Sequence, residues 1–135
     1  MRRTALAAAC CAALTPAAAL ASSAADGVWR TKSTKDGSYL EVTVAPCASN
    51  AEKTCGTISR AHSGIGEDGS QYEHLGRLII MDMSADGTDR WDDGKIWAPD
   101  DDKTYNANME LNGDVLRVEG CVFVICRGQD WTRVE

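Results

Sequence analysis

Short segments in which apolar and polar residues alternate recur along the chain from residue 27 onward. The segment Leu40-Glu41-Val42-Thr43-Val44 alternates, residues 105–111 do so without interruption, and residues 115–119 do so more loosely. A period of two puts one set of side chains on a core face and the other in water, which is typical of antiparallel sheet. Residues 75–83 are more uniformly apolar, and we expect them to form the most buried strand.

Turn signals separate these segments. Asp36-Gly37, Asp86-Gly87, Asp93-Gly94 and Asn112-Gly113 are pairs that supply the positive φ of tight hairpins, and residues 99–102 form a further acidic turn. The spacing, roughly 8–12 residues per strand, predicts eight or nine strands, and no segment keeps a helical period. The fold class is therefore all-β, a small antiparallel up-and-down barrel of about eight strands or a sandwich. Closure is favoured because it removes exposed edges.

The first two dozen residues are typical of an export signal. Arg2 and Arg3 give a positive start, residues 5–14 are apolar, and Ala19-Leu20-Ala21 fits a signal peptidase site. We expect residues 1–21 to be a cleaved signal peptide, with Ala24 as the alternative end, and residues 26–135 to be a single domain. The apolar run is shorter than the roughly 20 residues that span a bilayer. The expected location is periplasmic or secreted.

Charge limits the classes of partner. Removing Arg2 and Arg3 from the 14 basic side chains leaves 12 against 20 acidic ones, a net charge of −8. Such a surface repels nucleic acid and anionic lipid head groups. We expect no nucleic-acid partner, no membrane span, and a monomer or a weak oligomer.

Four cysteines remain after the signal, namely Cys47, Cys55, Cys121 and Cys126. An even number in an exported domain predicts disulfides. The polar loop between the first two is short enough to close as a hairpin, and a bridge between the last two requires the chain to turn within residues 122–125, because a straight strand would hold the sulfurs too far apart. Two local bridges are the preferred pairing, although each cysteine of the second pair bonding to one of the first is the alternative.

Trp29 opens the domain and Arg133 closes it. In a closed barrel the first and last strands are neighbours, so the guanidinium of Arg133 is expected over the indole of Trp29 as a barrel-closing pair. The alternative is an anion-binding arginine.

Large rings and thioethers suggest where a pocket would lie. We expect a ligand pocket, or alternatively an ordinary core, from the side chains that combine bulk with adaptability. These are Trp91, Trp97, Tyr105, Met81, Met83 and Met109.

Catalytic and metal-binding patterns are weak. His62 and His74 are the only histidines, and their spacing from Glu67 and Asp68 matches no known ligand set. We expect no enzyme, no metal and no cofactor.

A family resemblance adds to this. Residues 91–99 (Trp-Asp-Asp-Gly-Lys-Ile-Trp-Ala-Pro), then Lys103-Thr104-Tyr105, residues 116–121 and the closing Trp131-Thr132-Arg133 resemble the bacterial exported family called domain of unknown function 2147. The resemblance implies a lipocalin-like (calycin) barrel, in which an arginine of the last strand packs over the tryptophan of the first. It implies no catalytic residues. Residues 61–77 depart from the family pattern.

The leading hypothesis is an exported barrel that binds a small apolar or amphipathic molecule. The alternative is a cell-envelope or host-facing interaction module whose barrel is filled by its own side chains, since a barrel of about eight strands is just wide enough for either.

Overall fold

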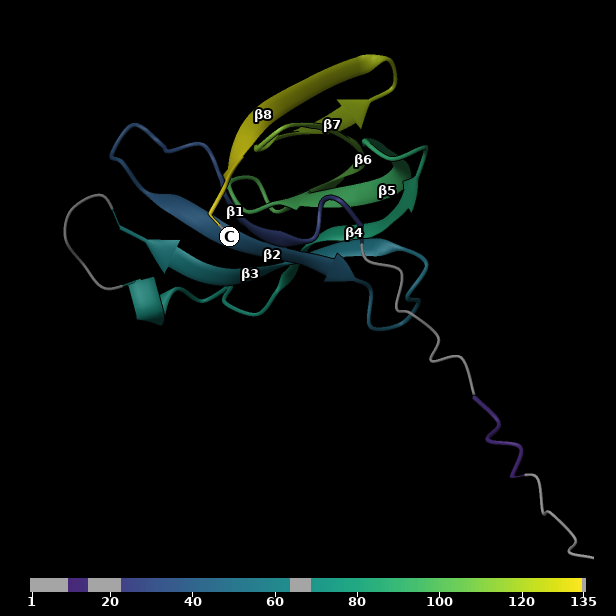
Figure 1. Ribbon diagram of the computed structural model, residues 1–135. Helices are drawn as coiled ribbons and strands as arrows, with labels where there is room; N and C mark the ends of the chain where they lie inside the picture. Colours follow the sequence, from purple (N-terminus) through teal and green to yellow (C-terminus); the bar gives the residue numbers. More distant parts are fainter. Residues whose placement is uncertain (1–9, 15–22, 64–68, 135) are drawn as a thin grey trace, which may run out of the picture.

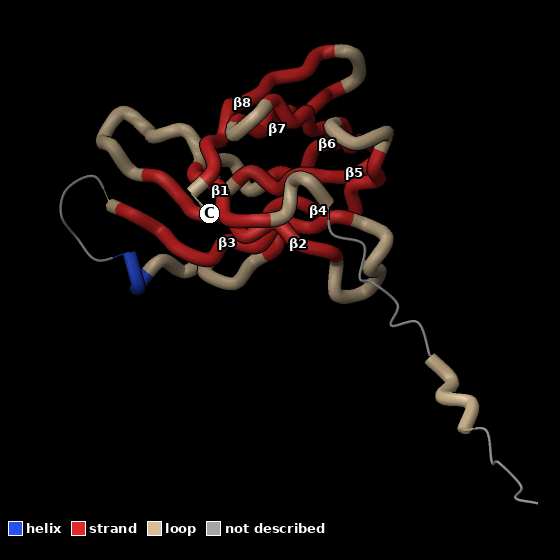
Figure 2. Tube along the Cα trace, viewed as in Figure 1, coloured by secondary structure: helices blue, strands red, loops and turns tan. Residues whose placement is uncertain are grey.

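The chain forms an all-β structure (Figures 1 and 2). The computed structural model describes residues 10–14, 23–63 and 69–134. Its elements are β1 (Gly27–Arg30), β2 (Tyr39–Pro46), β3 (Thr54–His62), the 3₁₀ helix η1 (Gly69–Gln71), β4 (Leu78–Ala85), β5 (Arg90–Ala98), β6 (Lys103–Asn112), β7 (Val115–Val122) and β8 (Ile125–Arg133). Most of the expected signal peptide, with its cleavage site after Ala21, lies outside the described residues.

The eight strands form one closed barrel. Each strand pairs antiparallel with the next in sequence, and β8 returns to β1, so the predicted up-and-down barrel is confirmed. No helix in the described ranges has the length and apolar character that crossing a bilayer requires.

The β1–β8 seam is short. β1 has four residues, and it pairs with β8 only through Trp29↔Arg133 and Arg30↔Thr132. The chain leaves the barrel wall at Thr31, where Leu40 donates its N–H to Oγ1 of Thr31 at 2.9 Å. The first half of β8 therefore pairs with β7 on one side and does not pair with β1 on the other.

Two sequence expectations need correction. Asp93-Gly94 is not a turn but lies inside β5, where Asp93 has a φ of 56° and the register with β6 shifts between Trp91 and Gly94. A β-bulge needs the same left-handed backbone as a hairpin turn, so the two give the same sequence signal. The apolar run 75–83 is only partly buried, because β4 begins at Leu78, which is 45% exposed.

The tightest packing fills the end of the barrel that holds the β2–β3, β4–β5 and β6–β7 turns. Trp29, Met83, Trp91, Met109 and Leu116 are almost completely buried there. Their side chains alternate with exposed neighbours along each strand, as half-buried strands require. We call this the closed end, and the other the open end.

Candidate ligand-binding cavity

Two disulfides fix hairpins at opposite ends of the barrel. Cys47 bonds to Cys55 (S–S 2.00 Å, Cα–Cα 4.9 Å), and Cys121 bonds to Cys126 (S–S 2.05 Å, Cα–Cα 4.1 Å). The first joins β3 to the segment after β2 at the closed end. The second spans β7 and β8 at the open end, one residue pair below the turn. The preferred local pairing is therefore the one found.

Arg133 and Trp29 lie together at the closed end. The guanidinium carbon lies 4.3 Å from the centre of the indole, and the same side chain donates to the backbone oxygens of Asp26 (3.1 Å) and Ala24 (3.0 Å). Nε1 of Trp29 donates to the oxygen of Ala25 at 2.8 Å. The segment before β1 is thus tied across this end.

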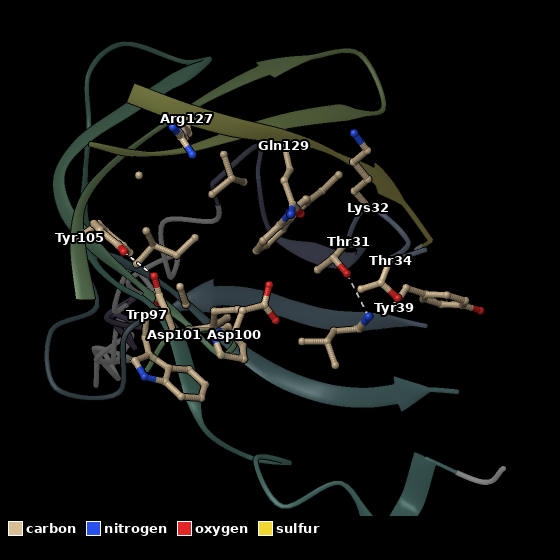
Figure 3. Close-up of a pocket in the computed structure, with 18 of the residues that line it drawn as sticks. Thr31, Lys32, Thr34, Tyr39, Trp97, Asp100, Asp101, Tyr105, Arg127 and Gln129 are labelled. Carbon is tan, nitrogen blue, oxygen red and sulfur yellow. Dashed lines mark hydrogen bonds between the residues drawn. The ribbon is translucent and has the colours of Figure 1, made fainter. Parts of the chain in front are cut away.

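A cavity of about 1110 Å³ occupies the open end (Figure 3). Its wall carries apolar side chains from several strands, and the loops of the open end form its rim. The apolar lining includes Leu40, Tyr72, Ile79, Ile96, Trp97, Tyr105, Val118 and Trp131. A volume of this size lies slightly above the usual range of small-molecule sites, about 300–1,000 Å³.

Charged and polar groups surround the mouth of the cavity. Figure 3 shows Arg127 and Gln129 on β8 and Lys32 on the loop after β1, with Asp100 and Asp101 on the β5–β6 turn. Within the described ranges neither Lys32 nor Arg127 forms an ion pair.

One rim carboxylate already has a partner. Asp101 accepts the phenolic O–H of Tyr105 at 2.6 Å and the N–H of Lys103 at 3.2 Å. The hydrogen bond from Tyr105 raises the pKa of its phenol. The ring of Tyr105 is therefore held in one orientation at the side of the cavity.

The structure divides the expected pocket residues into two groups. Trp97 and Tyr105 line the cavity, whereas Met83, Trp91 and Met109 lie in the closed-end core. Met81 is partly buried against that core and does not line the cavity. Alternation shows that such residues share a face of the sheet but not how far along the barrel axis each one lies, so this part of the expectation is corrected.

Trp97 joins the β3–β4 segment to the β5–β6 turn. The guanidinium carbon of Arg77 lies 3.4 Å from its ring centre, and Nε1 donates to Oδ1 of Asp102 at 2.8 Å. The His74 ring meets it edge-on at 4.9 Å. Nearby, Tyr72 has a raised pKa, because burial and then the negative charge of Asp100 disfavour the phenolate.

The two histidines are held by different neighbours. His62 stacks on Tyr39 at 4.4 Å, and its Nε2 lies 3.2 Å from Oε2 of Glu41, whereas His74 contacts Trp97. Among described residues, the clusters compact enough to hold a metal are each built on a disulfide pair, whose sulfurs are already bonded to each other. Glu67 and Asp68 lie outside the described residues.

Sequence reasoning missed Arg127 and Gln129. Both side chains are polar, which does not mark them as interior, although a period of two puts them on the same face of β8 as the buried Trp131. The signal was present, because Trp131 fixes which face of β8 points inward.

An eight-stranded up-and-down barrel, closed at one end by a tryptophan–arginine pair and hollow at the other, defines a lipocalin-like protein. A family model described as "Uncharacterized protein conserved in bacteria (DUF2147)" matches residues 27–133, and the chain belongs to this family. Among solved structures it is similar to protein HP1028 from Helicobacter pylori, described as belonging to the lipocalin family. The TM-score is 0.62, with 14% identity over 82% of each chain. A comparison with curated proteins finds no match.

Proposed function

We propose that this protein is exported and binds a small apolar or amphipathic molecule in its barrel. The observation that carries the proposal is the cavity of about 1110 Å³ at the open end. A barrel filled by its own side chains, the alternative, would leave no such space. The similarity to a protein described as a lipocalin supports the same class of function.

The lining favours an amphipathic ligand. Ile79, Ile96, Val118 and Trp131 present apolar surface inside, and each 100 Å² of ligand surface buried there contributes about 2.5 kcal/mol before the costs of binding. Lys32 and Arg127 stand at the mouth, where a polar head group keeps contact with water. A fully polar ligand would lose its hydration in the interior without replacement hydrogen bonds.

Export agrees with the two disulfides. Such bridges persist in oxidising compartments and are rare in the cytosol. The proposed location is the periplasm or the extracellular medium. The proposed role is binding without catalysis, and the contacts of His62 with Glu41 and of His74 with Trp97 agree with structural roles for both rings.

Native mass spectrometry of the protein purified from its own cell envelope tests the proposal directly. We expect a bound small molecule that organic solvent extracts. In parallel, the uncharged dye N-phenyl-1-naphthylamine is expected to bind with a rise in its fluorescence. The absence of both a co-purified molecule and dye binding would contradict the proposal.

A matched pair of variants locates the binding. Leu40 lines the cavity, whereas Thr43, on the same strand, points to the outside by alternation. Leu40→Arg places a charge inside the cavity and is expected to weaken dye binding at least about tenfold, since burying an unpaired charge costs several kcal/mol. Thr43→Arg adds the same charge outside and is expected to leave dye binding unchanged. Equal effects of the two substitutions would place the dye elsewhere.

A further inference from the structure

The β7–β8 turn presents apolar side chains to water. Phe123 and Val124 are each 95% exposed, Ile125 is 68% exposed and Val122 is 51% exposed. We call residues 122–125 the hairpin tip. No other run of four consecutive large apolar residues in the described ranges is exposed in this way.

The side chains of the hairpin tip lie outside the buried core. Val122 pairs with Ile125, so Phe123 and Val124 form a two-residue turn, and Phe123 has a φ of 53°. Glycine or asparagine suits such a position, while a bulky residue is an outlier there. An apolar residue that is both strained and exposed contributes nothing to the core, which directs attention to a function outside the fold.

The hairpin tip is also held in place. The Cys121–Cys126 disulfide lies one residue pair below the turn, with its Cα atoms 4.1 Å apart. The two strands therefore cannot separate, and the apolar side chains stay at the end of the hairpin, at the upper edge of the molecule in Figure 1.

The hairpin tip belongs to the mouth of the cavity. All four of its residues line the open end, together with Arg127 just after the turn. Lys103 borders a shallow groove that Phe123 also lines. Whatever covers the tip therefore lies directly at the entrance for a ligand.

Size decides between a protein surface and a lipid surface. A specific protein interface buries about 800 Å² on each partner, which is far more than the side chains of a two-residue turn and its closing pair offer. Binding to a bilayer interface, in contrast, scales with the apolar area that is buried, so the few side chains of the tip contribute in proportion to their size.

Charge decides the type of lipid. The whole chain carries a net charge of −6, and the acidic turn with Asp100 and Asp101 stands at the same mouth. Anionic lipids would be repelled. Lys103 and Arg127, at the base of the hairpin tip, suit the phosphates of a zwitterionic interface instead.

We propose that the hairpin tip inserts into the interface of a zwitterionic lipid bilayer and so places the cavity mouth against the membrane. An apolar or amphipathic molecule then passes between bilayer and barrel without crossing water. This exchange rests on the proposed function, whereas insertion of the tip does not.

Co-sedimentation with phosphatidylcholine vesicles tests the insertion, using the oxidised chain from Ser22 onward. The wild type is expected to sediment with the vesicles. The double variant Phe123→Ser with Val124→Ser is expected to lower the partition coefficient at least about tenfold, from the apolar area lost. Phe123→Leu keeps the apolar character and is expected to retain sedimentation. Val115→Ser removes an exposed valine at the opposite end of β7 and serves as the matched control, with no change expected.

Three outcomes of the vesicle experiment would overturn the insertion. They are wild type that stays in the supernatant, equal loss of sedimentation from Val115→Ser, and sedimentation that requires phosphatidylglycerol and disappears in salt. A fourth outcome would also overturn it, namely wild type that does not bind vesicles but captures a protein through the hairpin tip. Binding of N-phenyl-1-naphthylamine to the wild type, measured without vesicles, separates the two proposals, because dye binding reports on the cavity and sedimentation reports on the hairpin tip. A wild type that sediments but binds no dye contradicts the proposed function and leaves the tip insertion standing.

Discussion

Arg133 contributes to the stability of the closed end through several contacts, although it lies at the end of the last strand. It lies over Trp29 and donates to two backbone oxygens of the segment before β1. Arg133→Met removes the charge and all these hydrogen bonds while keeping much of the side-chain volume. We expect the free energy of unfolding to fall by about 1–3 kcal/mol, measured by thermal or urea unfolding.

Arg117→Met is the control for Arg133. Arg117 also faces acidic partners, at 3.4 Å from Glu119 and 3.2 Å from Asp130, but on the exposed outer face. Exposed pairs of this kind contribute about 0–1 kcal/mol. An equal loss from both variants would show that Arg133 acts only as a surface charge.

The partly buried carboxyl group of Asp26 is expected to make the stability of the fold depend on pH. Burial raises the pKa of its carboxyl group, and the hydrogen bond from the Ser23 N–H only partly offsets this. The buried Oδ1 has no hydrogen-bond partner within the described residues. Because the folded state holds the proton more tightly than the unfolded state, this group's contribution to stability is full at a pH below the unfolded pKa. It is lost as the pH rises through the folded pKa.

Asp26→Asn therefore stabilises the chain at neutral pH, where the wild type keeps a charge at a partly buried site. The gain in melting temperature is expected to shrink as the pH falls through the raised pKa of the folded state and to vanish below about 4, the ordinary pKa of an aspartate. Differential scanning calorimetry of both proteins from about pH 3 to about pH 8, a range that includes that pKa, measures the difference in melting temperature. A gain that grows toward acid pH would contradict the assignment.

At the scale of elements, the β7–β8 hairpin keeps a turn that its sequence does not favour. Phe123→Gly removes the side chain from a left-handed position that glycine adopts freely. We expect the free energy of unfolding to rise by roughly 0.5–1 kcal/mol in the variant, after the extra freedom of glycine in the unfolded chain is subtracted.

Val124→Gly is the matched control, because Val124 is equally exposed but has no positive φ. It gains only unfolded-state entropy and is expected to be neutral or slightly destabilising. If both glycine variants lower the melting temperature alike, the backbone at Phe123 is not strained.

The elements themselves were largely predictable from the sequence. Strands β2, β6 and β7 follow from alternation, and the turns at Asp86-Gly87 and Asn112-Gly113 follow from residues that accept positive φ. The failure at Asp93-Gly94 has a physical reason, since a bulge within a strand and a turn between strands require the same local backbone. Only the pairing partners on both sides of β5 distinguish them, and local sequence does not contain that information.

At the scale of the whole molecule, the barrel joins two ends of opposite character. The closed end is packed with aromatic and sulfur-containing side chains and is sealed by Arg133, whereas the open end holds the cavity. Alternation put Tyr105 and Met109 on one face of the same predicted strand but could not show at which end of the barrel each lies. That depends on strand register around the whole barrel. The site was therefore predictable as a barrel interior and only in part as a set of residues.

This division predicts which tryptophan reports a ligand. Trp131 is buried at the cavity wall, with Nε1 donating to Oε1 of Gln129 at 3.2 Å, whereas Trp91 lies in the closed-end core. Occupation of the cavity by an apolar, non-fluorescent molecule is expected to change the emission of the wild type. Trp97 also lines the cavity, so Trp131→Phe is expected to reduce that change without abolishing it, whereas Trp91→Phe is expected to preserve it.

Calorimetry of the same two variants separates binding from reporting. A ligand that binds only the folded chain raises stability by about 2.7 kcal/mol at 100 times its dissociation constant. Both variants should keep such a rise, because phenylalanine retains an apolar wall at either position. If the emission change follows Trp91 instead, the ligand has entered the closed end, and the division of the barrel into a packed half and a binding half is wrong.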